Sequence, residues 1–373
     1  MKQLNVLCIC SGYLLSGKEF VSLNVFKGFI RHNQNFKVLY SGWNDGKFRK
    51  KISEMGIDAE PIKLGWYYIT KILWSLDSLR HYPAAVKKYG KARKKVRANI
   101  TYVDSFRPVI LLYPFIREKI VFHVNDPHAF SKINKVLLRF ADKKISAYIA
   151  ASGFIKNDLI ECGIDQKKIY VIHNGIEIFE DNQKKYMPEN KLRIGIVGQI
   201  LERKGHEDII NACQLLKGRT PFEILIFGAG PDSQISYLKK MVEDHGLSEN
   251  TKWMGFQSEK KAIYDLIDVL VAPTRNEEPF ALVALEAMSF RIPVIASRSG
   301  GFPESVRDNH TGFIVAKRSP DEIAEKLIWF YNNPDQLKVF GNNGRESAVN
   351  SFSIEKMQNS VQGLLNNLIN SGA

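Results

Sequence analysis

Two glutamates interrupt an otherwise apolar stretch, RNEEPFALVALEAMSFRIPVIAS, at residues 275–297. Glu278 stands just before an expected helix, and Glu286 stands about two turns into it. Because an unpaired ionised carboxylate is costly in a dry interior, we expect polar partners for both. Carboxylates accept hydrogen bonds from hydroxyl groups, so the pair could hold the sugar and the ribose of a nucleotide sugar. The alternative for Glu286 is a core carboxylate paired with Arg275 or Arg291.

The start of this helix could bind the phosphates of such a ligand. Pro279 has no backbone N–H group. The N–H groups that follow, those of Phe280, Ala281 and Leu282, are expected to face an anion, because a helix start carries unpaired donors and a positive dipole end. The sequence therefore predicts hydroxyl acceptors on both sides of a phosphate site.

A second stretch, GQILERKG at residues 198–205, follows another expected strand. Its adjacent cations, Arg203 and Lys204, could neutralise a diphosphate, the arginine by a forked contact and the lysine as a point charge. Gly198 opens the turn. The alternative is a basic turn that is merely solvated.

Two further glycine turns follow strands in the same half of the chain. FGAGPDS contains Gly228 and Gly230, but Ser233 stands where a dinucleotide fingerprint has its third glycine. ASRSGGFPESV contains the pair Gly300 and Gly301, which permits close backbone approach. Tight turn geometry explains both stretches without a cofactor.

The elements that must position these residues are short apolar strands alternating with helices, which is typical of parallel sheets covered on both faces. The fold class we predict is α/β, with two Rossmann-like, doubly wound domains. Domain boundaries are expected at 1–172, a linker at 173–190, a second domain at 191–350, and a C-terminal helix at 351–373 that returns to the first domain. Strands are expected at 4–10, 36–43, 108–114, 119–126, 147–152, 168–175, 192–198, 222–230, 251–256, 268–273, 292–297 and 312–317.

Composition narrows the class of protein. Of the 373 residues, 45% are hydrophobic and 25% charged, which are ordinary globular values, and the length suits two domains. No apolar run reaches the ~18 residues of a membrane span, and the start of the chain lacks a signal-peptide pattern, so we expect a cytoplasmic protein. The four cysteines have no CxxC spacing and the histidines form no HExxH, so neither disulfides nor a metal site is expected.

Charge is uneven along the chain. Residues 1–172 carry 30 Lys and Arg against 13 Asp and Glu, whereas residues 173–373 carry 23 against 26. A run of cations, Lys87–Arg97, follows Trp66, Tyr67, Tyr68 and Trp74. Aromatic anchors beside a cationic helix suit an anionic membrane surface. The alternative is a core-facing aromatic segment with a solvated lysine face.

Taken together, the order and spacing of these turns resemble glycosyltransferase family 4. The similar stretches are SGFIKNDLIECGIDQKKIYVIHNGI, GQILERKG, EEPFALVALEAM and PVIASRSGGFPESVRDNHTGFIV. The paired glutamates match the family motif of Glu, seven residues, Glu. The resemblance implies the GT-B fold, in which two domains face each other across a cleft, and sugar transfer with retention of anomeric configuration.

The resemblance also implies roles for individual residues. Glu278 would contact the donor sugar, Glu286 the ribose, and Arg203 with Lys204 the diphosphate. His123, in FHVND, would line the sugar pocket. Gly12 or Gly17 would belong to the glycine-rich first loop. The first domain would bind the acceptor and the second the nucleotide sugar.

Four positions depart from the family pattern. In the first loop, one glycine and Lys18 stand where a Gly-Gly pair is frequent. Gln199 stands where many members have arginine, Ala281 where a loop glycine is usual, and Arg291 where another glycine is common. Arg203 could supply the charge missing at Gln199.

The function we expect is transfer of a sugar from a nucleotide-diphosphate donor, UDP rather than GDP, to a hydroxyl of a glycan or lipid-linked acceptor in cell-surface polysaccharide or glycolipid synthesis. The chain has no Asp-x-Asp, so we expect no metal and no other cofactor. The acceptor would be met at the inner face of the membrane. The alternatives are another activity on the GT-B fold, namely a phosphorylase, an epimerase or an inactive scaffold, or a basic nucleic-acid-binding protein.

Overall fold

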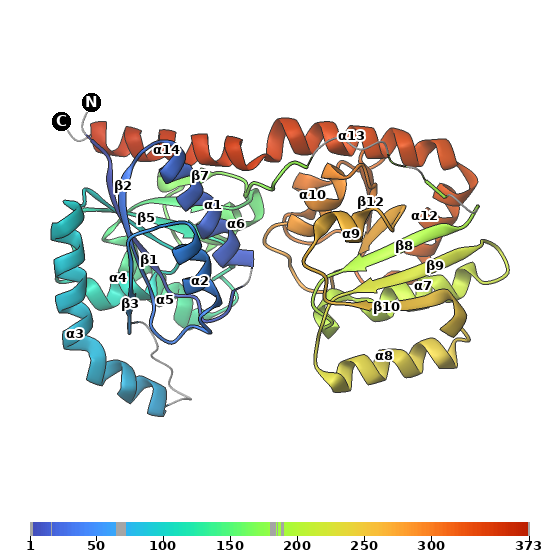
Figure 1. The fold of residues 1–373 in the computed structure, drawn as a ribbon, viewed down its shortest axis with the longest axis horizontal. Helices are drawn as coiled ribbons and strands as arrows, with labels where there is room; N and C mark the ends of the chain where they lie inside the picture. The colour runs from blue at the N-terminus through green and yellow to red at the C-terminus, as the bar shows by residue number, and fades with distance from the viewer. Residues whose placement is uncertain are drawn as a thin grey trace. The chain divides into compact units, whose positions relative to one another are not determined.

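The computed structural model describes residues 3–15, 17–64, 72–179, 184, 186–187 and 190–371. It divides into two compact units, which are described separately here (Figure 1). Unit 1 comprises Met1–Gly175 together with Ile354–Ala373, and unit 2 comprises Ile176–Ser353. Several residues of the linker expected at 173–190 lie outside the described residues, as do Trp66, Tyr67 and Tyr68.

Unit 1 is built on a parallel sheet with the order β3-β2-β1-β4-β5-β6-β7. Its strands alternate in sequence with helices that cover both faces. The strands are β1 Asn5–Cys10, β2 Asn35–Ser41, β3 Ala59–Ile62, β4 Ile100–Val103, β5 Lys119–Val124, β6 Ile145–Ala150 and β7 Ile169–Val171. The helices are α1 Gly17–Arg31, α2 Lys47–Glu54, α3 Ile72–Val96, α4 Arg107–Leu112, α5 Lys132–Asp142, α6 Gly153–Glu161 and α14 Ile354–Asn370, with a 3-10 turn at Gln166–Lys168.

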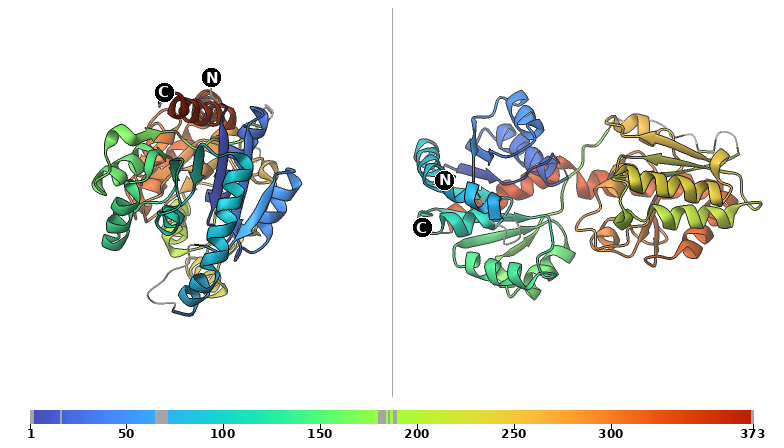
Figure 2. Two further views of the ribbon diagram at one scale, coloured as in Figure 1. Left: turned by 90° about the vertical axis from the view of Figure 1, so that its left-hand side faces the viewer. Right: turned by 90° about the horizontal axis from the view of Figure 1, so that it is seen from below.

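Two apolar clusters cover the two faces of this sheet. One contains residues of α3, α4, α5 and α6. The other contains residues of α1 and α14, and Figure 2 shows these two helices side by side. Within α14, Met357, Val361 and Leu365 are buried, and Gln358 donates a hydrogen bond to the carbonyl of Asn24 at 2.8 Å. The last described helix is therefore part of the core of unit 1.

The strand expected at 108–114 is wrong, because this segment contains helix α4. The strand of this part of the sheet is β4, Ile100–Val103, directly after the basic helix α3. A short apolar run fits a buried helix as well as a buried strand, so periodicity does not separate them. Pro108 supports the helix, since proline is favoured in the first turn.

Unit 2 repeats the architecture, with the strand order β10-β9-β8-β11-β12-β13. The strands are β8 Leu192–Val197, β9 Phe222–Phe227, β10 Thr251–Gly255, β11 Val269–Ala272, β12 Val294–Ser297 and β13 Gly312–Val315. The helices are α7 His206–Leu216, α8 Asp232–Asp244, α9 Lys260–Tyr264, α10 Leu282–Ser289, α11 Phe302–Ser305, α12 Pro320–Asn332 and α13 Pro334–Phe352, with 3-10 turns at Glu202–Lys204 and Ser248–Asn250. The prediction of two doubly wound α/β domains is confirmed.

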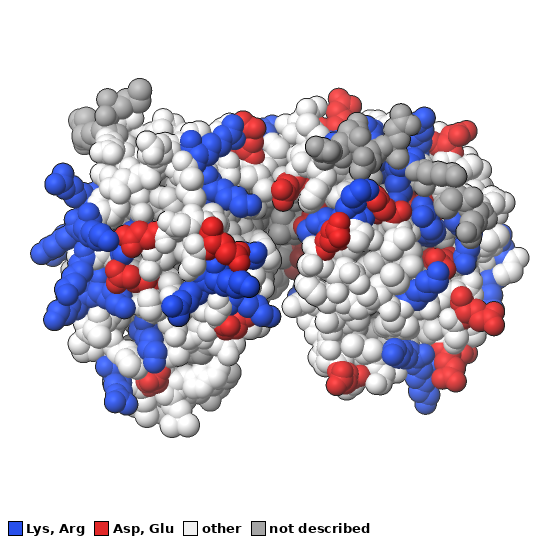
Figure 3. Space-filling view, in the orientation of Figure 1, with Lys and Arg blue, Asp and Glu red and all other residues white. Residues whose placement is uncertain are grey.

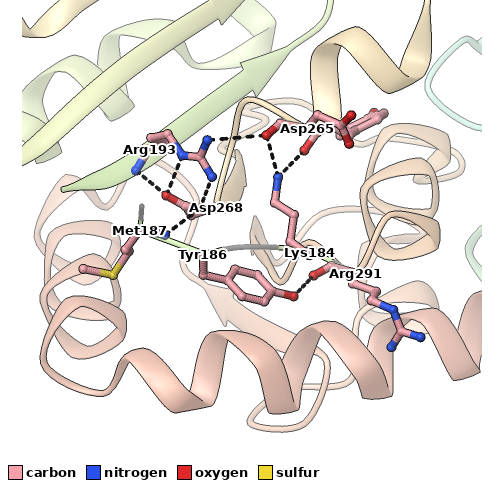
Figure 4. Close-up of polar contacts among 8 residues, drawn as sticks. Lys184, Tyr186, Met187, Arg193, Asp265, Asp268 and Arg291 are labelled. Carbon is pink, nitrogen blue, oxygen red and sulfur yellow. Dashed lines mark hydrogen bonds and ion pairs between the residues drawn. The ribbon is translucent and has the colours of Figure 1, made fainter. Parts of the chain in front are cut away.

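The chain entering unit 2 is tied to it by polar contacts (Figure 4). Asp268 is fully buried and accepts hydrogen bonds from the guanidinium of Arg193 at 2.6 and 3.0 Å and from the backbone N–H of Met187 at 3.1 Å. The Tyr186 hydroxyl donates to the carbonyl of Arg291 at 2.5 Å. Arg291 itself has a φ of 62°, the left-handed region that favours glycine, which explains why a glycine suits this position.

Both sheets share one topological feature that bears on function. In each, the strand order reverses between the first strand and the fourth, that is between β1 and β4 and between β8 and β11. Ligands of open α/β sheets bind beyond the carboxyl ends of the strands at such a reversal. Among the described residues, no helix combines the length and apolar character needed to cross a membrane.

Candidate functional site

In unit 2, the reversal of strand order brings together two of the residues singled out in the sequence. Lys204 follows β8 and Glu278 follows β11, and their side chains form an ion pair of 2.6 Å between Nζ and Oε2. Arg203 lies beside them, with a guanidinium nitrogen 4.0 Å from the same carboxylate oxygen. The pair is four-fifths buried and Arg203 is half exposed. The site therefore holds two cations and one carboxylate at the sheet edge where anions bind.

A sharp turn presents the two cations. Both belong to the 3-10 turn Glu202–Lys204. This turn is followed by Gly205, whose φ is 72°. A Cβ atom at Gly205 would lie 1.9 Å from the carbonyl oxygen of Pro273, so only glycine permits this approach of the β8 and β11 loops. Arg203 also donates to the side-chain oxygen of Gln199 at 3.1 Å. Gln199, which stands where many members of the resembled family have arginine, thus contacts Arg203.

Arg275 joins the two loops. Its guanidinium donates to both carboxylate oxygens of Asp208, at 2.6 and 2.9 Å, and lies 2.9 Å from Glu207. Its backbone N–H donates to the carbonyl of Arg203 at 2.9 Å. Hydrogen bonding to Asp208 raises the pKa of Arg275, although burial opposes the shift. Arg275 therefore pairs with Asp208 rather than with Glu286, and it positions the turn that carries Arg203.

Replacing Arg275 by lysine is expected to lower turnover about tenfold, because lysine keeps the charge but cannot form the forked contact with Asp208. The matched control is Arg219→Lys, since Arg219 is exposed in the same unit. Steady-state kinetics of both variants test the expectation. Equal kinetics for Arg275→Lys and the unchanged protein would show that the fork does not position the turn.

The loop that carries Glu278 is fixed by the loop after β12. The backbone N–H of Glu278 donates to Ser299 Oγ at 3.0 Å, and the Glu278 carbonyl accepts from Gly301 at 2.8 Å. A Cβ at Gly300, whose φ is 48°, would lie 1.9 Å from that carbonyl oxygen. Glu277 pairs with Lys317 and accepts from the Gly300 N–H at 2.6 Å. The glycine pair thus serves close backbone packing beside Glu278.

The helix start differs from the expectation. Helix α10 begins at Leu282, two residues after the expected start, and the Leu282 N–H donates to the carbonyl of Phe280 at 3.1 Å. In this structure the Leu282 N–H is thus engaged within the loop, and its contact with an anion stays a prediction. Phe280 and Ala281 precede the helix and are 5% and 0% exposed. The reason is that the chain after Pro279 makes one more tight turn before the helix begins.

Glu286 lies in the second turn of α10 and has polar partners from α9. Its carboxylate pairs with Lys260 and accepts from the Tyr264 hydroxyl at 3.2 Å. Neither arginine considered from the sequence fills this role, since Arg275 binds Asp208 and Arg291 contacts Asn342. The side chain of Glu286 is 21% exposed, so it remains accessible to a ligand.

In unit 1, His123 lies in β5 and is fully buried. Its Nδ1 atom lies 2.6 Å from the Tyr102 hydroxyl, and its Nε2 atom has no hydrogen-bond partner among the described residues. Burial lowers the pKa of His123 to about 4, so the ring is neutral near pH 7. A neutral imidazole can donate or accept one hydrogen bond at its second nitrogen, which is buried in this structure.

The reversal point of unit 1 contains Gly17, which is exposed and opens α1, and an acid that the sequence analysis missed. Asp104 follows β4, is 4% exposed, and accepts from the N–H and hydroxyl of Ser11 at 3.0 and 2.9 Å. Lys18 lies 3.9 Å from Asp104. Burial opposes protonation of Lys18, but Asp104 and Asp126 raise its pKa overall. The sequence signal was an acid directly after a short apolar strand.

Metal ligands do not cluster in the part of the chain that the structure describes. No group of three or more His, Cys, Asp or Glu side chains is arranged there to hold a metal ion. The four cysteines are buried and free.

Two family models match the chain. Residues 177–347 match the model described as "Glycosyl transferases group 1", and residues 17–178 match "Glycosyltransferase Family 4". An uncharacterised glycosyltransferase of Methanocaldococcus jannaschii is 25% identical over 68% of this chain and 70% of its own. A GDP-mannose-dependent alpha-(1-6)-phosphatidylinositol monomannoside mannosyltransferase of Mycobacterium tuberculosis is 30% identical over 44% of each chain.

Solved structures share the fold across the whole chain. A glycosyltransferase of Rickettsia africae superposes with a TM-score of 0.83 at 20% identity, covering 100% of both chains. HepE of Anabaena in complex with UDP superposes with a TM-score of 0.82 at 18% identity, covering 98% of this chain and 100% of its own. The fold is therefore GT-B.

Proposed function

The chain belongs to the family 4 glycosyltransferases, and we propose that it moves a sugar from a UDP-sugar to a hydroxyl of a glycan or lipid-linked acceptor, with retention of anomeric configuration. The observation that carries the proposal is the ion pair of Lys204 and Glu278 beside Arg203, at the strand reversal of unit 2. Cations here suit a diphosphate, and a carboxylate suits sugar hydroxyls. Among the functions considered from the sequence, the family match favours transfer over nucleic-acid binding.

The chemistry assigned to these groups follows from the bond that breaks. As the sugar leaves the diphosphate, negative charge develops on a phosphate oxygen, and fixed cations aimed at that oxygen stabilise the transition state. Lys204 has three donors, so it can keep its contact with Glu278 and also bind a phosphate. Glu278 and Glu286 would orient the sugar and the ribose, and the neutral ring of His123 would bind the sugar. We propose that no metal takes part.

Two observations from relatives support the donor and the acceptor. Structures of HepE contain UDP and UDP-glucose, which favours UDP, whereas the M. tuberculosis relative is named for GDP-mannose. A 24% identical relative is the lipopolysaccharide core mannosyltransferase LpcC of Rhizobium leguminosarum, which favours a cell-surface glycan or glycolipid. Lys and Arg side chains gather over α3, which carries most of the cation run Lys87–Arg97 and ends at Val96 (Figure 3). We propose that this helix attracts the protein to an anionic membrane from the cytoplasmic side.

Thermal unfolding with nucleotides tests the donor site. We expect UDP to raise the melting temperature more than GDP or ADP does, since a ligand at a hundredfold excess over its Kd stabilises the folded state by ~2.7 kcal/mol. The Lys204→Ala variant, which lacks the phosphate contact, should lose most of this shift. The same screen in EDTA should give the same result for a metal-independent site.

A larger shift with GDP would change the proposed donor and leave the site intact. No shift with any nucleoside diphosphate would overturn the proposed site itself.

A further inference from the structure

Helix α5 carries a row of apolar side chains on the side that faces away from the core. Ile133, Val136, Leu137 and Phe140 are 59%, 66%, 36% and 42% exposed. Their spacing of three, four and seven residues places them on one face of the helix. The helix buries only Leu138 and Ala141. Phe130, just before the helix, is 74% exposed and extends the apolar surface.

Cations border this apolar row, and they come from α5 and the turn after it. They are Lys132, Lys135, Arg139, Lys143 and Lys144. Two of them lie over aromatic rings of the same surface, Lys143 at 5.8 Å from the ring centre of Phe140 and Lys144 at 5.1 Å from that of Tyr113. These two rings stack on each other at 4.8 Å. Apolar and cationic groups therefore form one continuous surface.

The acids of α5 and α6 are already engaged within unit 1. Asp142 accepts from Lys168 and from the Tyr148 hydroxyl at 3.0 and 2.9 Å. Asp158 accepts the backbone N–H groups of residues 128 and 129 at 2.7 and 2.9 Å, and Glu161 pairs with Lys135 at 2.7 Å. Excess positive charge thus remains beside the apolar row.

The helix is fixed in place by polar contacts rather than by the apolar row. Ser131 caps its first turn by accepting from the Asn134 N–H at 3.2 Å. Arg139 Nε donates to the carbonyl of Cys162 at 2.6 Å, and Lys135 reaches Glu161 in α6. The row can therefore be exposed without loss of the helix.

We propose that the apolar row of α5 inserts into the surface of an anionic lipid bilayer. An amphipathic face with flanking cations matches the interface, where apolar side chains enter the acyl region and cations meet lipid phosphates. A second copy of the chain fits less well, since a two-fold contact through this row would bring the same cations together without free acids to meet them. The positive charge of this surface therefore favours an anionic bilayer over a second copy of the chain.

This surface is distinct from the cation run Lys87–Arg97, which lies on α3 and the residue after its end. Residues of α3 and α5 pack on the same side of the unit 1 sheet. The α3 run would supply attraction over a Debye length, whereas the α5 row would supply insertion, which salt does not screen. The inference deepens the proposed membrane-side function. Vesicle binding is measured without a donor, so its failure leaves the proposed sugar transfer untouched.

Co-sedimentation of the full chain with vesicles of phosphatidylcholine and phosphatidylserine tests the proposal. The test variant is Ile133→Gln with Val136→Gln, which removes apolar surface and keeps the charge. The matched control is Val339→Gln with Val349→Gln on α13 of unit 2, whose side chains are 45% and 40% exposed. We expect the test variant to lose affinity about tenfold for each changed residue, and the control to bind as the unchanged protein does.

Two further measurements separate a loss of membrane insertion from a loss of folding and from a loss of charge attraction. Thermal unfolding should show that both variants fold, and binding by the unchanged protein should remain in part at 0.5 M salt. Vesicle binding that is equal in the test variant, or equally weakened in the control, would overturn the proposal. A dimer of the unchanged protein in sedimentation that the test variant abolishes would overturn it in favour of a second copy.

Discussion

Replacing Lys204 by alanine is expected to lower turnover at least about a hundredfold while the fold survives. Lys204 is the more buried of the two cations at the unit 2 reversal point, so its charge is the less screened by water. Removing one preorganised group that stabilises developing charge costs about 10²- to 10³-fold in turnover. Rates of sugar transfer at saturating donor, with melting temperatures for both proteins, measure the effect.

The matched control for Lys204→Ala is Lys252→Ala. Lys252 also forms an ion pair in unit 2, at 2.7 Å from Glu223. It lies in β10 and not in the loops after β8 and β11 that form the reversal point. We expect its activity to stay within about twofold of the unchanged protein, since the Lys252 side chain is 58% exposed and an ion pair screened by water contributes less than about 1 kcal/mol. Equal losses in the two variants would indicate general destabilisation instead of a role for Lys204 in transfer.

Replacing Glu278 by alanine is expected to lower turnover by a similar factor, at least about a hundredfold. Glu278 stands in the loop between β11 and α10, and its carboxylate pairs with Lys204 at 2.6 Å. Its backbone is held by Ser299 and Gly301, so removing the carboxylate should leave the loop in place. Glu278→Gln keeps one acceptor oxygen and should retain more activity than Glu278→Ala.

The double variant Lys204→Ala with Glu278→Ala separates a shared role from two independent roles. Because the two side chains lie 2.6 Å apart, we expect the double loss to be much smaller than the product of the single losses. Glu346→Ala on α13, an exposed acid of the same unit, serves as the control. Near-normal turnover in both single variants would contradict the proposed site.

Much of the fold could be predicted because alternating strands and helices leave a strong signal along the chain. Strands such as β11 and β12 are short, nearly continuous apolar runs, and β12 ends in a serine. A strand was expected at 108–114, where the chain forms helix α4. The segment is short and apolar, and these two properties fit a buried strand and a buried helix equally well. The true strand β4 has only four residues and follows a run of cations, so it carried too few apolar positions to be seen.

The site was predictable in part. The types and spacing of Arg203, Lys204 and Glu278 were visible, although their role in catalysis stays a prediction. The ion pairs that hold the loops of the site were not visible. Arg275 and Asp208, for example, are separated by 67 residues, and they meet only because of which strands are neighbours in the sheet. Lys260 beside Glu286 was missed for the same reason: a helix that follows a different strand supplies it.

The placement of α14 constrains the order in which the protein can fold during synthesis. Unit 2 is one continuous segment of chain, whereas the core of unit 1 includes Met357, Val361 and Leu365, which are made after all of unit 2. Domains fold as units while the chain emerges. Unit 1 can therefore complete its core only after the whole of unit 2 has been made, and until α14 arrives the apolar surface beside α1 is the part of the nascent protein that a chaperone would need to protect.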